Sequence, residues 1–187
     1  GDHRDLHLSL RRQRQMCIRD SSLTIASGVG NPYFSVKFTG LGIDIGKHSI
    51  GHGGSFKDMS PGQLKVKIHK FHFQLMAELM KKLEAVPEGD GSMLDNTVIV
   101  YLSDAAEAHH SRCGQWPFVL IPGKNTGLQG GRYLDFPHYM QDGHREIGNL
   151  YTTLLHAAGE KREYFGVRDA MLKGAARGDG PLEALLA

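Results

Sequence analysis

Apolar and polar positions along the chain predict short strands that alternate with helices. Thr97–Leu102 and Phe118–Ile121 are apolar runs of strand length, separated by a polar interval. Tyr33–Ile45 begins with the alternation expected of a strand and then becomes rich in glycine. An unbroken apolar run such as Thr97–Leu102 suits a strand buried on both faces, which is typical of a parallel sheet covered by helices.

Two helices are predicted by apolar residues that recur every three or four positions. The first begins after Ser60, because Ser60, Pro61 and Gln63 carry the N-cap, first-turn proline and capping-box signals. Its apolar stripe is formed by Leu64, Ile68, Phe71, Leu75, Leu79, Leu83 and Val86. The second helix is predicted over Arg145–Ala158, with Gly159 closing its end.

This order of elements predicts an α/β fold with a partial, mostly parallel sheet and flanking helices. A strand, a helix and a second strand form a βαβ unit when the crossover is right-handed and the strands are parallel. Residues 22–187 show no internal domain boundary, and the closing GPLEALLA segment is expected to dock on the body of the domain. The interval Gly46–Ser60 is predicted as a loop, because its glycines disfavour a helix.

Candidate metal ligands follow both predicted strands of this βαβ unit. His48 and His52 come after the first strand, and Asp104, His109 and His110 come after the second. Because the carboxyl ends of parallel strands meet at one sheet edge, we expect the five side chains to converge there. Carboxylate and imidazole ligands suit zinc, manganese or iron better than calcium. The alternative for His48 and His52 is a pair of solvated loop histidines.

Two further features leave alternatives open. His69 and His72 lie three positions apart near the border of the first helix's stripe, where a metal pair or simple amphipathic cover is possible. Cys113 is close in sequence to His109 and His110 and raises the alternative of a thiol enzyme. A lone cysteine is more often a small apolar residue.

The net charge of +2 depends on the amino-terminal segment. Residues 11–21, RRQRQMCIRDS, resemble the in-frame translation of a transposon-end adapter used in DNA library preparation, so residues 1–21 are expected to be non-native. They hold five of the 22 basic and three of the 20 acidic residues, and the remainder is formally neutral. No basic patch then predicts a nucleic-acid partner, although a basic nucleic-acid or targeting arm is the alternative. No apolar run is long enough to predict a transmembrane segment.

Several passages occur in an order that carries a family resemblance. They are HSIGHGG, HKFHFQLMAELMKKL, EGDGSMLDNTVIVYLSD, AHHSRCGQWPFVLIPG, GGRYLDFP, IGNLYTTLLHAAG and GPLEALL. Together they make the chain from about Tyr33 to Ala187 similar to the carboxyl-terminal half of the HXXSHH-motif proteins. This bacterial family of unassigned function is itself similar to the alkaline-phosphatase and sulfatase superfamily. Gly51 and Gly53 stand where the naming motif has Ser and its last His.

The resemblance implies an alkaline-phosphatase-like domain truncated at its amino-terminal side and exported to the periplasm or cell surface. Asp104 matches the superfamily's metal-ligating Asp, Ala105 replaces the His that usually follows it, and His109 and His110 are expected to compensate. The superfamily nucleophile belongs to the amino-terminal half, and a signal region is not present in this fragment. The implied function is metal-dependent hydrolysis of a small anionic ester or glycan-type substrate. The alternative is a non-catalytic exported binding or structural domain.

Overall fold

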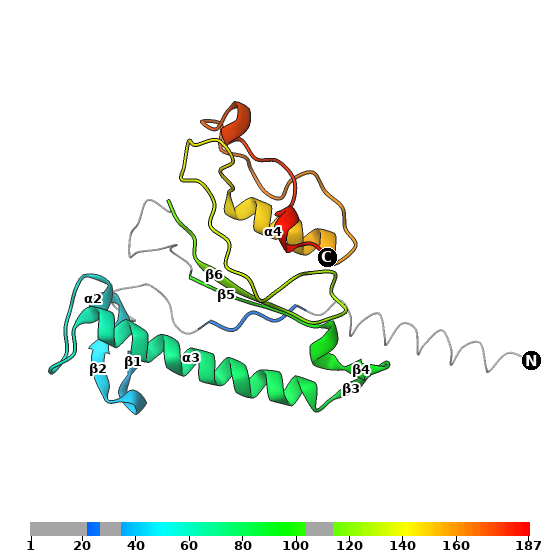
Figure 1. The fold of residues 1–187 in the computed structure, drawn as a ribbon. Coiled ribbons are helices and arrows are strands. Elements are labelled where there is room, and N and C mark those ends of the chain that lie inside the picture. Colours follow the sequence, from blue (N-terminus) through cyan, green and yellow to red (C-terminus); the bar gives the residue numbers. More distant parts are fainter. Residues whose placement is uncertain (1–21, 27–34, 104–113) are drawn as a thin grey trace, which may run out of the picture.

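The computed structural model describes residues 22–26, 35–103 and 114–187, and residues 1–21 lie outside this part of the chain. Figure 1 shows its helices and strands. They are β1 (Lys37–Phe38), β2 (Ile43–Gly46), α2 (Lys47–Gly51), α3 (Pro61–Glu84), β3 (Pro87–Glu88), β4 (Gly91–Ser92), β5 (Val98–Leu102), β6 (Phe118–Pro122) and α4 (Ile147–Ala157). Short 3₁₀ turns are η2 (Thr39–Leu41), η3 (Met93–Asn96), η4 (Gly174–Ala176) and η5 (Glu183–Leu185).

The predicted parallel sheet of an alkaline-phosphatase-like α/β fold is wrong. The strands of the described residues form three separate two-stranded sheets, β1–β2, β3–β4 and β5–β6, and each is antiparallel. β2 therefore belongs to a different sheet from β5, and α3 is not a crossover between parallel partners. The apolar run of β5 has another cause, because helices cover both faces of the β5–β6 hairpin.

The β5–β6 hairpin lies as a middle layer between α3 and α4 (Figure 1). Successive side chains of a strand point to opposite faces. Val98 and Val100 pack with Leu150 of α4 on one face. Tyr101, which follows Val100, reaches the other face, where its hydroxyl contacts His69 of α3. This alternation decides which side chains of the hairpin can meet the histidines of α3.

Helix α3 begins where its capping signals predict. The backbone N–H of Gln63 donates to Ser60 Oγ at 3.4 Å, and the Ser60 N–H donates to Gln63 Oε1 at 2.8 Å. The predicted apolar stripe is buried only near the start of the helix, at Leu64 and Ile68, and His72 continues this buried line. Leu75 is 47% exposed. The second half of α3 therefore keeps part of its apolar stripe in solvent.

Helix α4 holds the carboxyl-terminal segment through buried polar side chains. Asn149 Nδ2 donates to Gly178 O and Gly180 O, each at 2.8 Å. Thr153 Oγ1 accepts the backbone N–H of Leu182 at 2.7 Å. These bonds satisfy polar groups that would otherwise be buried without partners. They place the closing segment on α4, which confirms the predicted docking of GPLEALLA.

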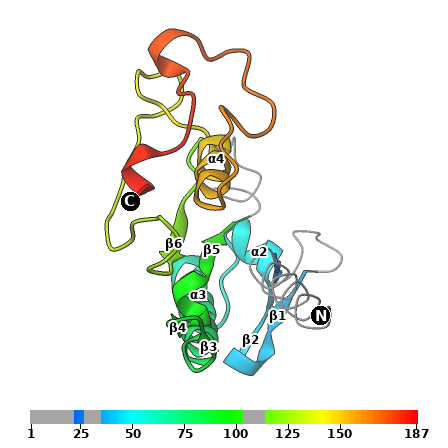
Figure 2. The same cartoon turned by 90° about the vertical axis from the view of Figure 1, so that its right-hand side faces the viewer.

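The buried apolar residues form two separate clusters. The first contains Ile43, Ile50, Leu64 and Ile68, and it joins β2, α2 and the start of α3. The second contains Leu128, Leu150, Leu182 and Leu185, and it joins α4, the β5–β6 hairpin and the closing segment. Figure 2 shows β1, β2 and α2 beside α3, on the far side of the hairpin from α4. Within the described ranges no helix is long and apolar enough to cross a membrane.

Candidate functional site

His48 and His52 lie at a short helix, not in the predicted loop. The loop predicted over Gly46–Ser60 is wrong for Lys47–Gly51, which form α2, because the glycines end this helix instead of preventing it; residues 52–60 contain no helix or named strand. The N–H of Gly54 donates to Ser49 O at 2.8 Å and that of Gly53 to Ile50 O at 3.1 Å. Gly53 has a φ of 87°, which favours glycine at this position of a Schellman motif. Helix α2 thereby carries His48, and His52 is its C-cap.

The four-residue spacing on α2 brings the two imidazoles together. The ring centroids of His48 and His52 are 4.8 Å apart, with an angle of 66° between the planes. Two imidazoles that bind one ion at about 2.0–2.1 Å have centroids about 4.5–5.2 Å apart for ligand angles between octahedral and tetrahedral. The observed separation fits two ligands of one ion.

A second group of side chains joins α3 to β5. Tyr101 Oη lies 2.6 Å from His69 Nδ1 and 3.0 Å from His72 Nδ1. The His72 side chain is almost fully buried, and its ring also meets the edge of Phe38 from β1. His69 is exposed. One phenol hydroxyl is therefore shared between a buried and an exposed imidazole.

The surroundings of this second group favour neutral imidazoles. Burial lowers the pKa of His69, and the ammonium groups of Lys47 and Lys65 lower it further. Burial also lowers the pKa of His72, followed by Lys47 and then His69. Burial raises the pKa of Tyr101, which keeps its hydroxyl protonated. At neutral pH the group is a phenol between two uncharged rings.

Helix α2, which carries His48, packs against the start of α3, the helix that carries His69 and His72. Ile50 of α2 packs with Leu64 and Ile68 of α3, so α2 is fixed against the first turns of that helix. Lys47, which directly precedes His48, acts electrostatically on both His69 and His72. The packing of α2 on α3 thus places Lys47 close enough to act on both histidines of α3.

The remaining predicted ligands, Asp104, His109 and His110, lie outside the described residues, as does Cys113. Their expected convergence with His48 and His52 was argued from parallel strands, and that argument fails with the antiparallel topology. Residues 22–26, 35–103 and 114–187 contain no group of three or more His, Cys, Asp or Glu side chains that could hold a metal ion. His48 and His52 are therefore the part of the predicted site that the structure brings together.

Tyr101 is a site residue that sequence reasoning missed. It follows Val98 and Val100 in the predicted strand, and strand alternation places it on the opposite face from them. Strand alternation therefore indicates the face of the strand on which Tyr101 lies, but no local sequence pattern identifies α3 as the helix that packs there. Beyond β5, Trp116 Nε1 donates to Ser103 O at 2.9 Å and ties the two strands together at this end of the hairpin.

Comparisons with protein-family models, curated proteins and solved structures found no match to this chain. The resemblance to the HXXSHH-motif proteins stays a prediction based on the passages quoted above.

Proposed function

We propose that the chain is a divalent-metal-binding domain in which His48 and His52 supply two ligands. The observation that carries this proposal is the 4.8 Å separation of their ring centroids on α2. Neutral imidazole is a common ligand of zinc, manganese and iron. Asp104, His109 and His110 are the proposed further ligands, and they remain predictions from the sequence.

The activity that we propose for this site is hydrolysis of a small anionic ester. A bound divalent ion would supply Lewis-acid polarisation of a phosphoryl or sulfuryl oxygen. The chain itself contributes rigid ligand placement, because Ile50 is buried and Ser35 Oγ accepts the backbone N–H of His48 at 2.8 Å. The ammonium group of Lys47 adds positive charge beside the site, which suits an anionic substrate.

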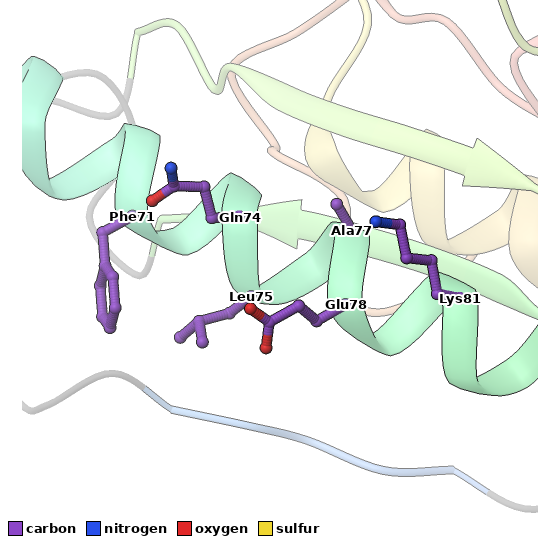
Figure 3. A pocket seen from close by; sticks show the side chains of 6 residues that line it. All are labelled: Phe71, Gln74, Leu75, Ala77, Glu78 and Lys81. Carbon is purple, nitrogen blue, oxygen red and sulfur yellow. The ribbon is translucent and has the colours of Figure 1, made fainter.

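A non-catalytic binding domain is the second candidate, and the outer face of α3 favours it. Figure 3 shows Phe71, Leu75 and Glu78 projecting to one side of α3. An open groove on this face is lined by Phe71, Gln74, Leu75, Ala77, Glu78 and Lys81. Exposed apolar side chains along a groove are typical of interaction surfaces. A non-catalytic binding domain can also bind a metal ion, so metal binding alone does not separate the two candidate functions. Hydrolysis of an ester substrate does separate them.

Metal binding is tested by elemental analysis of purified protein and by titration of the metal-free form with zinc, manganese, ferrous iron and calcium. We expect one tightly bound transition-metal ion and weak calcium binding. His48→Ala and His52→Ala should each weaken affinity by more than about 100-fold, beyond the range of outer-shell partners. Asp104→Ala should do the same if it is a ligand.

The matched control is His138→Ala, which removes an exposed histidine far from α2 in the chain and should leave affinity unchanged. The proposal is contradicted if the wild-type protein binds no metal. It is also contradicted if the variants at His48, His52, Asp104 and His138 all bind metal with the same affinity. A panel of aryl phosphate and aryl sulfate esters then tests the activity. Metal-dependent turnover supports the hydrolase, and metal binding without turnover supports the binding domain.

A further inference from the structure

The outer edge of β5 carries backbone groups that have no partner in the described residues. The N–H of Gly123 donates to Thr97 O at 2.8 Å, in register with the pairs of the β5–β6 hairpin. Because bonded and non-bonded pairs alternate along an antiparallel ladder, Val98, Val100 and Leu102 turn their N–H and C=O groups away from β6. β5 pairs with no second strand, and no backbone hydrogen bond reaches these three residues from the part of the chain that the structure describes.

The outer edge of β6 is closed to a further strand, in contrast to that of β5. Pro122 stands opposite Val98 in a non-bonded pair, so its nitrogen faces outward and has no hydrogen to donate. A Cβ atom on Gly130 would lie 3.0 Å from Pro122 Cδ, so the chain at Gly130 packs directly on this edge. β5 contains neither proline nor a charged residue, the features that protect exposed edges. The open edge of the hairpin is therefore that of β5.

We propose that β5 pairs with β5 of a second copy of this chain, antiparallel and across a two-fold axis at Val100. In this register Val98 lies opposite Leu102 of the partner subunit, and Val100 lies opposite Val100 of the partner subunit. Every outward N–H of the three residues then meets a C=O across the axis. An isologous contact needs a strand that complements itself, and β5 does so because its outward residues are spaced evenly about Val100 and all are apolar. This inference goes beyond metal binding and does not depend on it.

The pairing also enlarges the sheet to which β5 and β6 belong. A two-stranded hairpin alone is marginally stable, and further strands with an apolar face, or packing against a helix, are what stabilise it. A two-fold axis perpendicular to the sheet exchanges the two copies without exchanging the faces of the sheet. The dimer therefore has one four-stranded sheet, with both copies of α4 on one face and both copies of α3 on the other.

An apolar ring stands beside the open edge on the α3 face. Phe73 of α3 is 41% exposed, although its ring centroid lies 5.2 Å from that of Tyr101 in β5. Both copies of α3 share this face in the dimer, so the exposed part of Phe73 lies on the face that the partner shares. Aromatic residues are enriched in protein interfaces. The surface next to the strand therefore suits the same contact as the strand itself.

The first test uses the wild-type chain and needs no variant. Sedimentation velocity over a wide range of protein concentrations should show a species of twice the monomer mass. Amide hydrogen exchange at Val98, Val100 and Leu102 should slow by at least about 10-fold as the dimer forms, because each amide gains an acceptor. Ile99 and Tyr101 are internal controls, since their amides donate to β6 and should be protected at every concentration.

Three outcomes of this test overturn the proposal. The first is a monomer at every concentration. The second is a dimer in which the amides of residues 98, 100 and 102 stay unprotected, because the copies then meet through another surface. The third is protection of these amides in the monomer, because another part of the chain then covers the edge of β5.

The second test places a charge on the open edge. Leu102→Lys sets a lysine against Val98 of the partner subunit at both ends of the pairing, and it should raise the dissociation constant of the dimer by about 10-fold. Leu102 packs in neither apolar cluster of the described residues, so the fold of the monomer should persist. Val119→Lys is the matched control, because Val119 is 39% exposed and lies on β6. Equal dissociation constants for the two variants would overturn the pairing.

Discussion

At the residue scale, the neutral histidines of α3 link the acid–base chemistry of the chain to its stability. Their pKa values are lowered in the folded state, so the unfolded chain binds protons that the folded chain does not. The sign follows from linkage: this contribution to stability is complete above the ordinary pKa of 6.5 and is lost as the pH falls below it. Acid should therefore weaken the contact between α3 and β5.

We expect the free energy of unfolding to fall as the pH is lowered below the ordinary histidine pKa of 6.5, and His72→Asn to reduce that slope. Urea unfolding at a series of pH values measures it. His138→Asn is the control, because this histidine is exposed on another part of the chain and should leave the slope unchanged. Equal slopes in wild type and His72→Asn would show that burial of this ring does not disfavour its charged form.

At the element scale, local signals predicted α3 and α4 well, although not the short α2, because caps and periodicity are encoded within a few residues. Ser60 and Gln63 fix the start of α3, and Gly159, with a φ of 88°, closes α4. The direction of strand pairing is not encoded in this way. An apolar run such as β5 is equally compatible with a parallel sheet and with a hairpin between two helices, so the predicted topology failed.

Helix α4 provides a sharp test of how an element organises a segment without regular structure. Asn149→Asp keeps the oxygen that accepts from the Glu146 N–H at 2.7 Å but replaces the amide that donates to two carbonyls. We expect destabilisation of about 3–5 kcal/mol, because two buried acceptors lose their donor and face a carboxylate. Urea unfolding measures the change.

Asn125→Asp is the matched control for α4, because Asn125 is exposed and its side chain donates to Asn96 Oδ1. Its effect should stay within about 0.5 kcal/mol. If both substitutions cost the same, the buried amide of Asn149 does not hold the closing segment.

At the scale of the whole molecule, the described residues form two separate apolar clusters. One joins β2, α2 and the start of α3, and the other joins α4, the β5–β6 hairpin and the closing segment. Sequence analysis predicted one domain with one sheet, because periodicity shows that a face is buried but not against which partner. The same limit applies to predicting the candidate site from the sequence. The four-residue spacing of His48 and His52 places both on one face of a helix, but the glycines around them predicted a loop, so their pairing was not predicted from spacing. His72 and Tyr101 are 29 positions apart, and no local pattern relates them.

We expect the two clusters to respond separately to cavity-forming substitutions. Leu64→Ala and Leu150→Ala each remove a fully buried side chain and should cost about 2–5 kcal/mol locally. Amide hydrogen exchange should accelerate in β1, β2 and α2 for the first variant, and in α4 for the second. Acceleration spread evenly over both clusters in either variant would instead indicate one cooperative unit.

The bond between Trp116 and Ser103 has a practical consequence. Trp116 is the single tryptophan of the chain, and its indole N–H is tied to the end of β5 that carries Tyr101. Tryptophan emission therefore reports on one defined place without any added label. Loss of the 2.9 Å bond would let the indole N–H donate to water instead and would shift the wavelength of the tryptophan emission. A conformational change at this end of the hairpin is therefore expected to change the fluorescence of Trp116.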